Sequence, residues 1–185
     1  SMIVNADATG VDSTSATDAR ITKVGYFIRR YKLDELTQLI NVLIGDMSLV
    51  GPRPNVKRET DQYTPIEQKL LLVKPGITDF ASIVFSDEGE ILRDMDDPDL
   101  AYNQLIRPGK SMLGLFYIEH GSLWIDIYLC YATVVAILSR NIALKLIVKR
   151  LTNLGASQNL IDIASRSAEL IPMPPPGASE IVTAR

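Results

Sequence analysis

The chain has 185 residues, of which 46% are apolar and 22% charged, with a mean hydropathy of +0.11 and a formal net charge of −3. This length suits one domain, or one domain with a tail. The acidic balance gives no reason to expect nucleic acid as a partner, because a polyanion is bound by a clustered basic face. The single cysteine and single histidine exclude an intrachain disulfide and argue against a zinc site. The hydropathy indicates apolar surface for a partner or a lipid, although no apolar run is long enough to span a membrane.

The amino-terminal part predicts two consecutive helices. Apolar residues recur at helical spacing over residues 21–31 and again over residues 33–44, where they line one face while polar side chains share another. Gly45 ends the second helix. The Gly-Pro-Arg-Pro sequence further on forms an irregular turn, because its two prolines exclude helix at the residues before them, and this turn presents Arg53.

The middle of the chain predicts short elements separated by helix breakers. Residues 64–72 fit a short helix, which a Lys-Pro-Gly sequence ends. The apolar run over residues 81–85 predicts a strand, and the acidic residues 87–90 predict a turn. A further helix begins with Pro98 in its first turn and is interrupted or kinked at Pro108.

The most apolar part of the chain, residues 123–151, predicts two helices parted near Asn141. Three aromatic residues near its start have helical spacing, which is more typical of a core than of lipid contact, although such residues also favour membrane interfaces: Trp124, Tyr128 and Tyr131. The basic residues later in the segment fit a helix lying on a membrane surface and equally an ordinary solvated face.

Two adjacent carboxylates, Asp34 and Glu35, are the candidates for chemistry. They fall in the first turn of the predicted amphipathic helix, where carboxylates are common, so helix-end decoration is the simpler interpretation of their position alone. The neighbouring arginines and the turn that carries Arg53 favour a phosphate and metal site instead. One carboxylate can hold Mg²⁺ that screens a diphosphate, and its neighbour can then attack phosphorus.

The run from Arg29 to Pro54, which contains these carboxylates and the Gly-Pro-Arg-Pro turn, closely resembles the bacterial sugar transferase family, the monotopic phosphoglycosyl transferases. The Lys-Pro-Gly-Ile-Thr sequence of residues 74–78 is similar to a later motif of the family. The Ser-Leu-Trp-Ile-Asp sequence of residues 122–126 is similar to the segment that opens its late helix. The resemblance spans about residues 1 to 140.

The resemblance implies a two-step reaction on a nucleotide sugar, with a UDP-sugar expected. An aspartate attacks the sugar-linked phosphate, releases the nucleoside monophosphate and passes the phosphosugar to a membrane polyprenyl phosphate. By matching position, Asp34 is the expected nucleophile and Glu35 the Mg²⁺-binding partner. The other expected site residues bind substrate. Arg29 and Arg53 are expected to hold phosphate, Lys74 and Thr78 to line the nucleotide side, and Asp126 to serve as a late acidic position.

The sequence departs from the family pattern in three places. Thr37 stands where proline is usual, which we expect to be harmless, because a first-turn proline mainly favours helix initiation. Asp79 replaces a usual glycine, so a side chain and a charge enter a turn that is expected to face the nucleotide and to affect substrate preference. Ser1-Met2 is similar to the end of a Lys-Phe-Arg-Ser-Met motif, so we expect a preceding membrane-inserted helical hairpin to be missing.

The expected fold class is mostly α with a few short strands (α+β). We expect a compact helical catalytic domain over residues 1–151, with amphipathic helices at a membrane surface. Residues 152–185 form a carboxy-terminal extension, with one weak helical pattern and then a Pro-rich stretch, residues 172–177, that cannot bury a core. We expect this tail to be extended or partly disordered.

The expected product is a sugar-phosphate lipid that initiates a surface glycan at the cytoplasmic face of the bacterial inner membrane, with a homodimer as one possible assembly. Without the missing hairpin, the chain itself is expected to be soluble. Two alternatives stay open: a non-catalytic scaffold at the membrane surface, and a soluble Mg²⁺-dependent phosphohydrolase in which the same carboxylates act with water as the acceptor.

Overall fold

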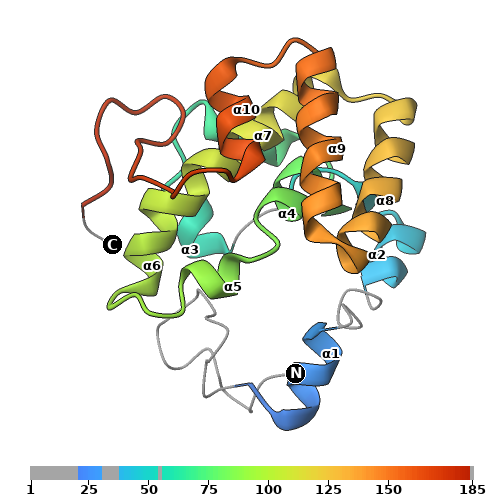
Figure 1. The fold of residues 1–185 in the computed structure, drawn as a ribbon, viewed down its shortest axis with the longest axis horizontal. Helices are drawn as coiled ribbons and strands as arrows, with labels where there is room; N and C mark the ends of the chain where they lie inside the picture. Colours follow the sequence, from blue (N-terminus) through green and yellow to red (C-terminus); the bar gives the residue numbers. More distant parts are fainter. Residues whose placement is uncertain (1–20, 31–37, 54–55, 184–185) are drawn as a thin grey trace.

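The computed structural model describes residues 21–30, 38–53 and 56–183 (Figure 1). This described part is mostly helical with two short strands, which confirms the predicted α+β class. The elements in chain order are α1 (Lys23–Arg30), α2 (Gln38–Ile44), β1 (Ser48–Val50), α3 (Lys57–Thr60), η3 (Glu67–Leu72), β2 (Gly76–Thr78), α4 (Phe80–Val84), α5 (Glu88–Ile91), α6 (Pro98–Ala101), η4 (Tyr102–Ile106), α7 (Arg107–His120), α8 (Leu123–Leu138), α9 (Arg140–Asn153) and α10 (Gln158–Ser165).

The short helix α4 lies at the centre of the core and is in contact with α7, α8 and α9. Four of its five residues are buried. The prediction of a strand over residues 81–85 is therefore wrong. A short apolar run that is buried on all sides has no period that separates strand from helix. Here Asp79 decides the outcome, because its carboxylate accepts the Ser82 N–H at 2.7 Å and caps a helix.

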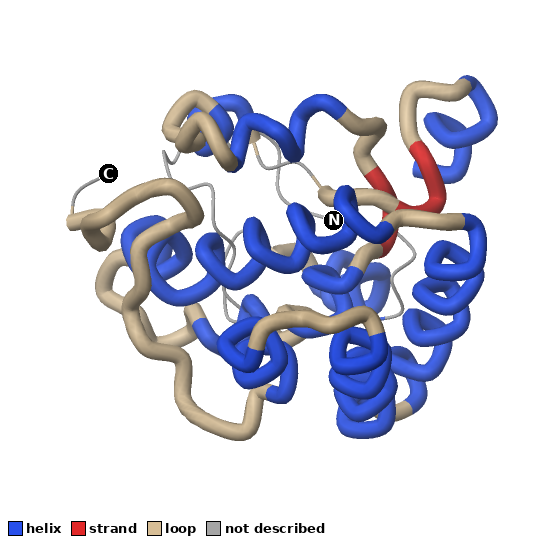
Figure 2. The backbone as a smooth tube through the Cα atoms, turned by 90° about the horizontal axis from the view of Figure 1, so that it is seen from above, coloured by secondary structure: helices blue, strands red, loops and turns tan. Residues whose placement is uncertain are grey.

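The two strands, which the sequence did not predict, pair in parallel (Figure 2). Ser48 lies opposite Gly76 and Val50 opposite Thr78. Gly45 ends α2 in the left-handed conformation, with a φ of 95°, as predicted for a helix stop. Because α2 and α8 both contact β1, and α8 also contacts β2, the small sheet joins the amino-terminal elements to the helical core.

The other short elements follow the predicted breakers with local differences. Residues 67–72 form a 3₁₀ helix, η3, within the predicted 64–72 helix. The predicted turn at residues 87–90 is instead the one-turn helix α5. Pro98 does occupy the first turn of α6, where the Asp97 side chain accepts the Leu100 N–H. A π-helical turn, η4, immediately precedes Arg107 and so adjusts the chain before Pro108.

Helices α8 and α9 run side by side and part at Ser139, two residues before the predicted point (Figure 1). The interpretation of the aromatic residues as core is wrong for Trp124 and Tyr131, whose side chains are 74% and 58% exposed. Tyr128 is half-buried and donates its hydroxyl proton to the Leu146 carbonyl at 2.8 Å. The inner face of α8 is formed by smaller aliphatic residues instead.

Helix α10 packs on α7 and α9, and Leu160, Ile163 and Ala164 of α10 belong to the core. Beyond α10 the described tail has no helix or strand. It is nevertheless hydrogen-bonded to earlier parts of the chain: Thr64 donates to the Pro176 carbonyl at 2.5 Å, and Gln104 donates to the Val182 carbonyl at 2.7 Å. A division into a domain over residues 1–151 and a separate extension stays a prediction.

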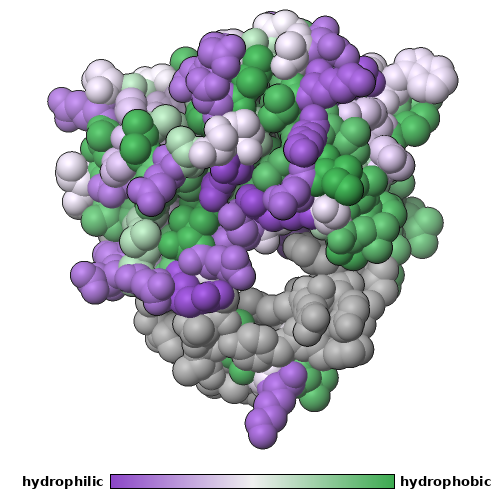
Figure 3. All heavy atoms as spheres, in the orientation of Figure 1, coloured by the Kyte–Doolittle hydropathy of each residue, from purple (hydrophilic) through white to green (hydrophobic). Residues whose placement is uncertain are grey.

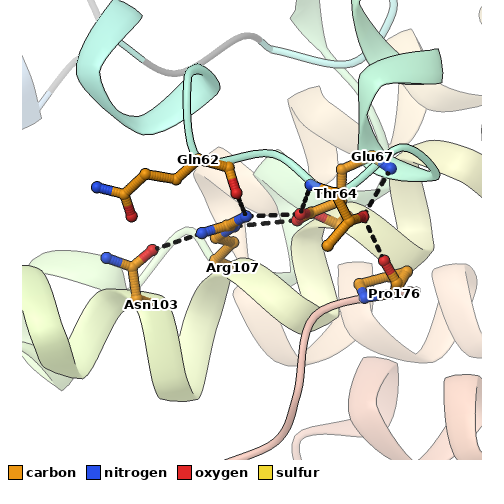
Figure 4. Close-up of polar contacts among 7 residues, drawn as sticks. Gln62, Thr64, Glu67, Asn103, Arg107 and Pro176 are labelled. Carbon is orange, nitrogen blue, oxygen red and sulfur yellow. Dashed lines mark hydrogen bonds and ion pairs between the residues drawn. The ribbon is translucent and has the colours of Figure 1, made fainter. Parts of the chain in front are cut away.

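Beneath this tail lies a buried ion pair between Arg107 and Glu67 (Figure 4). The two side chains are 2% and 0% exposed, and the guanidinium donates to both carboxylate oxygens at 3.0 and 2.6 Å. Further polar groups complete the network: the Gln62 carbonyl, the Asn103 amide oxygen and the Ser111 hydroxyl. A buried charge pair is tolerated when its remaining donors and acceptors are satisfied in this way.

Candidate functional site

The two predicted catalytic carboxylates, Asp34 and Glu35, lie outside the described residues. The backbone of Arg29 belongs to α1, and its side chain also lies outside the described part. The structure therefore bears on the site through the predicted residues that follow α2: Arg53, Lys74, Thr78 and Asp126.

Arg53 is exposed on the turn that follows β1. The start of this turn is held tightly against β2, because the Gly51 N–H donates to the Thr78 carbonyl at 3.0 Å and a Cβ on Gly76 would overlap the Gly51 backbone. A Cβ on Gly51 would in turn come within 2.7 Å of the Lys74 carbonyl oxygen. The lack of side chains at both glycines thus allows the two backbones to meet and fixes where the Arg53 turn begins.

Thr78, at the end of β2, is buried and engaged within the fold. Its hydroxyl lies 2.6 Å from the hydroxyl of Thr133 on α8 and 3.3 Å from that of Ser82 on α4. Thr133 also donates to the Leu129 carbonyl, so it can accept the proton of Thr78. These contacts make Thr78 a link between β2 and α8, and a direct contact with nucleotide stays a prediction.

Asp79 follows immediately and is only 2% exposed. Its carboxylate caps α4, and the Ser82 hydroxyl accepts the Asp79 N–H in return. Burial raises the pKa of Asp79, against the lowering effect of its hydrogen bonds to Ser82. The side chain that replaces the usual glycine therefore points into the fold, where it starts a helix.

Lys74 is exposed just before β2, and its ammonium group lies beside Gly45 at the carboxy-terminal end of α2. A cation is favoured at this position, because the last carbonyls of a helix carry partial negative charge. This contact with the end of α2 is a structural role for Lys74, and its place on the nucleotide side stays a prediction.

Asp126 lies in the first turn of α8 and is half-buried. It accepts a hydrogen bond of 2.7 Å from the hydroxyl of Tyr117 on α7. The same hydroxyl lies 3.3 Å from the carbonyl oxygen of Val50, the last residue of β1. The structure therefore brings Asp126 close to the base of the Arg53 turn, a proximity that the sequence did not reveal. Tyr117 was missed because nothing in the local pattern distinguishes it from other aromatic residues of α7.

Among the described residues there is no group of three or more metal-ligating side chains, and no helix is both long and apolar enough to cross a membrane. The predicted Mg²⁺ ligand, Glu35, lies outside the described residues, and Mg²⁺ binding by its carboxylate stays a prediction.

Residues 1–140 match the bacterial sugar transferase family. The chain belongs to this family. All the predicted site residues fall within the matched part, while most of α9, α10 and the tail follow it. The expectation drawn from the sequence signature is confirmed at the level of the family.

Three relatives illustrate this bacterial sugar transferase family. The chain is 34% identical to the UDP-N-acetylgalactosamine-undecaprenyl-phosphate N-acetylgalactosaminephosphotransferase of Aeromonas hydrophila over 75% of its own length and 30% of the relative's. It is 39% identical to the UDP-glucose:undecaprenyl-phosphate glucose-1-phosphate transferase of Escherichia coli K12, over 67% and 25%. It is 38% identical to the undecaprenyl-phosphate galactose phosphotransferase of Salmonella typhimurium, over 67% and 23%. The chain thus spans less than a third of the length of these relatives.

Proposed function

We propose that this chain is the catalytic part of an enzyme that transfers a sugar 1-phosphate from a UDP-sugar to undecaprenyl phosphate. The observation that carries the proposal is the family match over residues 1–140, which includes Asp34, Glu35 and every other predicted site residue. The three relatives described above differ in the sugar that their names specify and share the undecaprenyl phosphate acceptor.

In the first step, a carboxylate oxygen of Asp34 attacks the sugar-linked phosphorus of the donor. A bond forms between this oxygen and phosphorus, and the bond from phosphorus to the bridging oxygen breaks, so that UMP leaves with the electron pair. In the second step, an oxygen of undecaprenyl phosphate attacks the same phosphorus and releases the Asp34 carboxylate. Two displacements at one site allow two bulky substrates to react without being bound together.

Arg53 and Arg29 are proposed to bind the phosphate oxygens of the donor, since a planar guanidinium matches two such oxygens. The close contact of Gly51 with β2 supports this role for Arg53, because it fixes where the turn begins. Glu35 is proposed to hold Mg²⁺, which when bound would screen the negative charge that the nucleophile must approach.

A membrane surface is the proposed partner of the apolar side chains of α2 and α8, which we call the α2–α8 surface. Figure 3 shows apolar residues over these helices. Its members are all at least 40% exposed: Leu39, Ile40, Leu43, Ile44, Leu123, Trp124, Ile127, Tyr131, Val134, Ile137 and Leu138. So many large apolar side chains in one region mark a contact surface. A lipid bilayer is the chosen partner because the proposed acceptor is a membrane lipid and because Trp and Tyr favour membrane interfaces.

The covalent intermediate provides the test of the reaction. The protein is incubated with Mg²⁺ and, in separate reactions, UDP-glucose, UDP-galactose and UDP-N-acetylgalactosamine, and its intact mass is measured. We expect a phosphosugar adduct with at least one donor, and its loss in Asp34→Asn. The matched control is Asp162→Asn, which removes an exposed carboxylate on α10, outside the family match.

Repeating the incubation with and without undecaprenyl phosphate, and measuring the UMP and phosphosugar released, separates the two alternative functions. A scaffold forms no adduct and releases no UMP with any donor. A phosphohydrolase releases phosphosugar to water at the same rate whether or not undecaprenyl phosphate is present. An adduct that is retained in Asp34→Asn would contradict the proposed nucleophile.

A further inference from the structure

The hydroxyl of Tyr117 lies where three separate elements meet. Tyr117 is on α7, Asp126 begins α8, and Val50 ends β1 just before the Arg53 turn. The hydroxyl is 2.7 Å from the Asp126 Oδ1 atom and 3.3 Å from the Val50 carbonyl oxygen. A phenol has only one hydroxyl proton to donate. The contact with Asp126 is the stronger hydrogen bond, because it is shorter and its acceptor is charged.

Tyr117 is well suited to act as a permanent donor. Burial raises the pKa of Tyr117, and the hydrogen bond to Asp126 raises it further, so the phenol keeps its proton at any pH near neutrality. Its ring packs against the core, which limits how far the hydroxyl can move. A donor of fixed position and fixed protonation can determine the orientation of the carboxylate that it contacts.

We propose that Tyr117 is a positioning residue for binding of the sugar-nucleotide donor. It orients the Asp126 carboxylate beside the base of the Arg53 turn. The inference rests on the proposed function, because it deepens the role given there to the residues around Arg53. Tyr117 contacts only Oδ1 of Asp126, so Oδ2 can accept a hydrogen bond from a hydroxyl group of the donor.

The contact also links two parts of the site that the sequence keeps far apart. Without the phenol proton, the Asp126 side chain in the first turn of α8 could adopt other rotamers. The Val50 carbonyl would lose its contact with α7 at the same time. Donor binding should therefore weaken even though no group that touches phosphorus has changed.

The test uses the whole gene product in lipid nanodiscs, with undecaprenyl phosphate as acceptor and the UDP-sugar that forms the Asp34 adduct as donor. Four variants are compared with the wild type: Tyr117→Phe, Asp126→Asn, the double variant, and Tyr128→Phe as a matched control. The Tyr128→Phe variant likewise removes one hydroxyl, which donates to the Leu146 carbonyl at 2.8 Å in the wild type. This hydroxyl is not hydrogen-bonded to Asp126. Melting temperature, kcat and donor KM are measured for each.

We expect Tyr117→Phe to raise donor KM about fivefold to tenfold with kcat within about twofold of the wild type, the effect of losing one hydrogen bond to a charged group used in binding. Asp126→Asn should raise KM at least as much, and the double variant should be no worse than Asp126→Asn alone. Tyr128→Phe should leave KM unchanged. It should lower the melting temperature by about as much as Tyr117→Phe does.

Each contrary result has one meaning. If the wild type forms no Asp34 adduct, the proposed function fails and the inference with it. If the adduct forms but Asp126→Asn leaves KM unchanged, Asp126 does not bind the donor and Tyr117 cannot act through it. If Asp126→Asn raises KM while Tyr117→Phe behaves like Tyr128→Phe, or if the effects of Tyr117→Phe and Asp126→Asn multiply in the double variant, the positioning role alone is overturned.

Discussion

The region around Arg107 and the α2–α8 surface are opposite in character: the first buries charged side chains, and the second exposes apolar ones. Around Arg107, two charges that are almost fully buried are satisfied by the Gln62 carbonyl, which precedes η3, and by side chains of η4 and α7. On the α2–α8 surface, Leu43 and Leu138 are 87% and 82% exposed, and the described part of α2 contains no buried residue. One region is closed within the chain, and the other offers apolar area to something else. The buried charges and the proposed membrane contact thus lie in different parts of one small fold.

The largest expected effect is on the closed region. Arg107→Met should lower the free energy of unfolding by about 3–5 kcal/mol, because it leaves the Glu67 carboxylate buried without its cation. Urea unfolding measures this loss. The double variant Arg107→Met with Glu67→Leu should recover much of the stability, since it removes both charges together. A double variant that is less stable than Arg107→Met alone would show that Glu67 stabilises the fold through its other hydrogen bonds, from the Ser111 hydroxyl and the Thr64 N–H.

The second prediction concerns the base of the Arg53 turn. Gly76→Ala should destabilise the protein by about 1–3 kcal/mol, because the added Cβ overlaps the Gly51 backbone and forces the strands apart. Urea unfolding gives the energy, and binding of the UDP-sugar donor should weaken with it. The control is Gly155→Ala. The φ of 77° at this position is strained for alanine, but the added Cβ would have no other atom within 4 Å. Equal donor affinity in both variants would mean that the position of the turn does not matter for binding.

The third prediction tests the open region directly. Leu123→Ser should leave the unfolding free energy almost unchanged but weaken binding to vesicles of anionic bacterial lipids by about fivefold to tenfold, the loss of one leucine side chain from an apolar contact. Ile171→Ser is the matched control, because Ile171 in the tail is 69% exposed and Leu123 is 71% exposed. Vesicle co-sedimentation compares the two. The same loss in both variants would exclude the α2–α8 surface as the specific site of contact.

The smallest effect is expected from the pH dependence of Asp79. The pKa of Asp79 is raised in the folded protein, so the folded state holds this proton more strongly than the unfolded state. The contribution of Asp79 to the free energy of unfolding therefore falls as pH rises from the ordinary pKa of 3.8 to the raised pKa. Asp79→Asn keeps a capping side chain and removes the titration. The stability of Asp79→Asn relative to the wild type should therefore improve as pH rises through this window, as measured by urea unfolding at a series of pH values. A difference that does not change with pH would contradict the sign of the shift.

The features that sequence patterns predicted correctly are those set by local chemistry. Gly45 ends α2 and Pro98 begins α6, since each acts through its own backbone. The division between α8 and α9 was placed within two residues. The strand expected at residues 81–85 failed because the helix there depends on a cap one residue earlier, in a segment too short and too buried to show a period.

The candidate site divides in the same way. Its chemical residues were predicted from the family signature, and the family is confirmed, while the individual roles stay predictions. The contact between Tyr117 and Asp126 was not predictable, because it depends on how α7 meets α8 and β1. The exposure of Trp124 was not predictable either, since helical spacing alone does not say which face of a helix is covered.

The end of the family match has a practical consequence for anyone who expresses this protein. The match stops at residue 140, where α9 begins, yet fully buried side chains lie beyond it: Ala143, Ile147, Leu151 and Ala164. A gene cut at the limit of family similarity would uncover the inner face of α8 and discard the helix that closes the core. A cloning boundary here is better set by packing than by similarity, and it should keep the tail as far as the residues that hold Gln104 and Thr64.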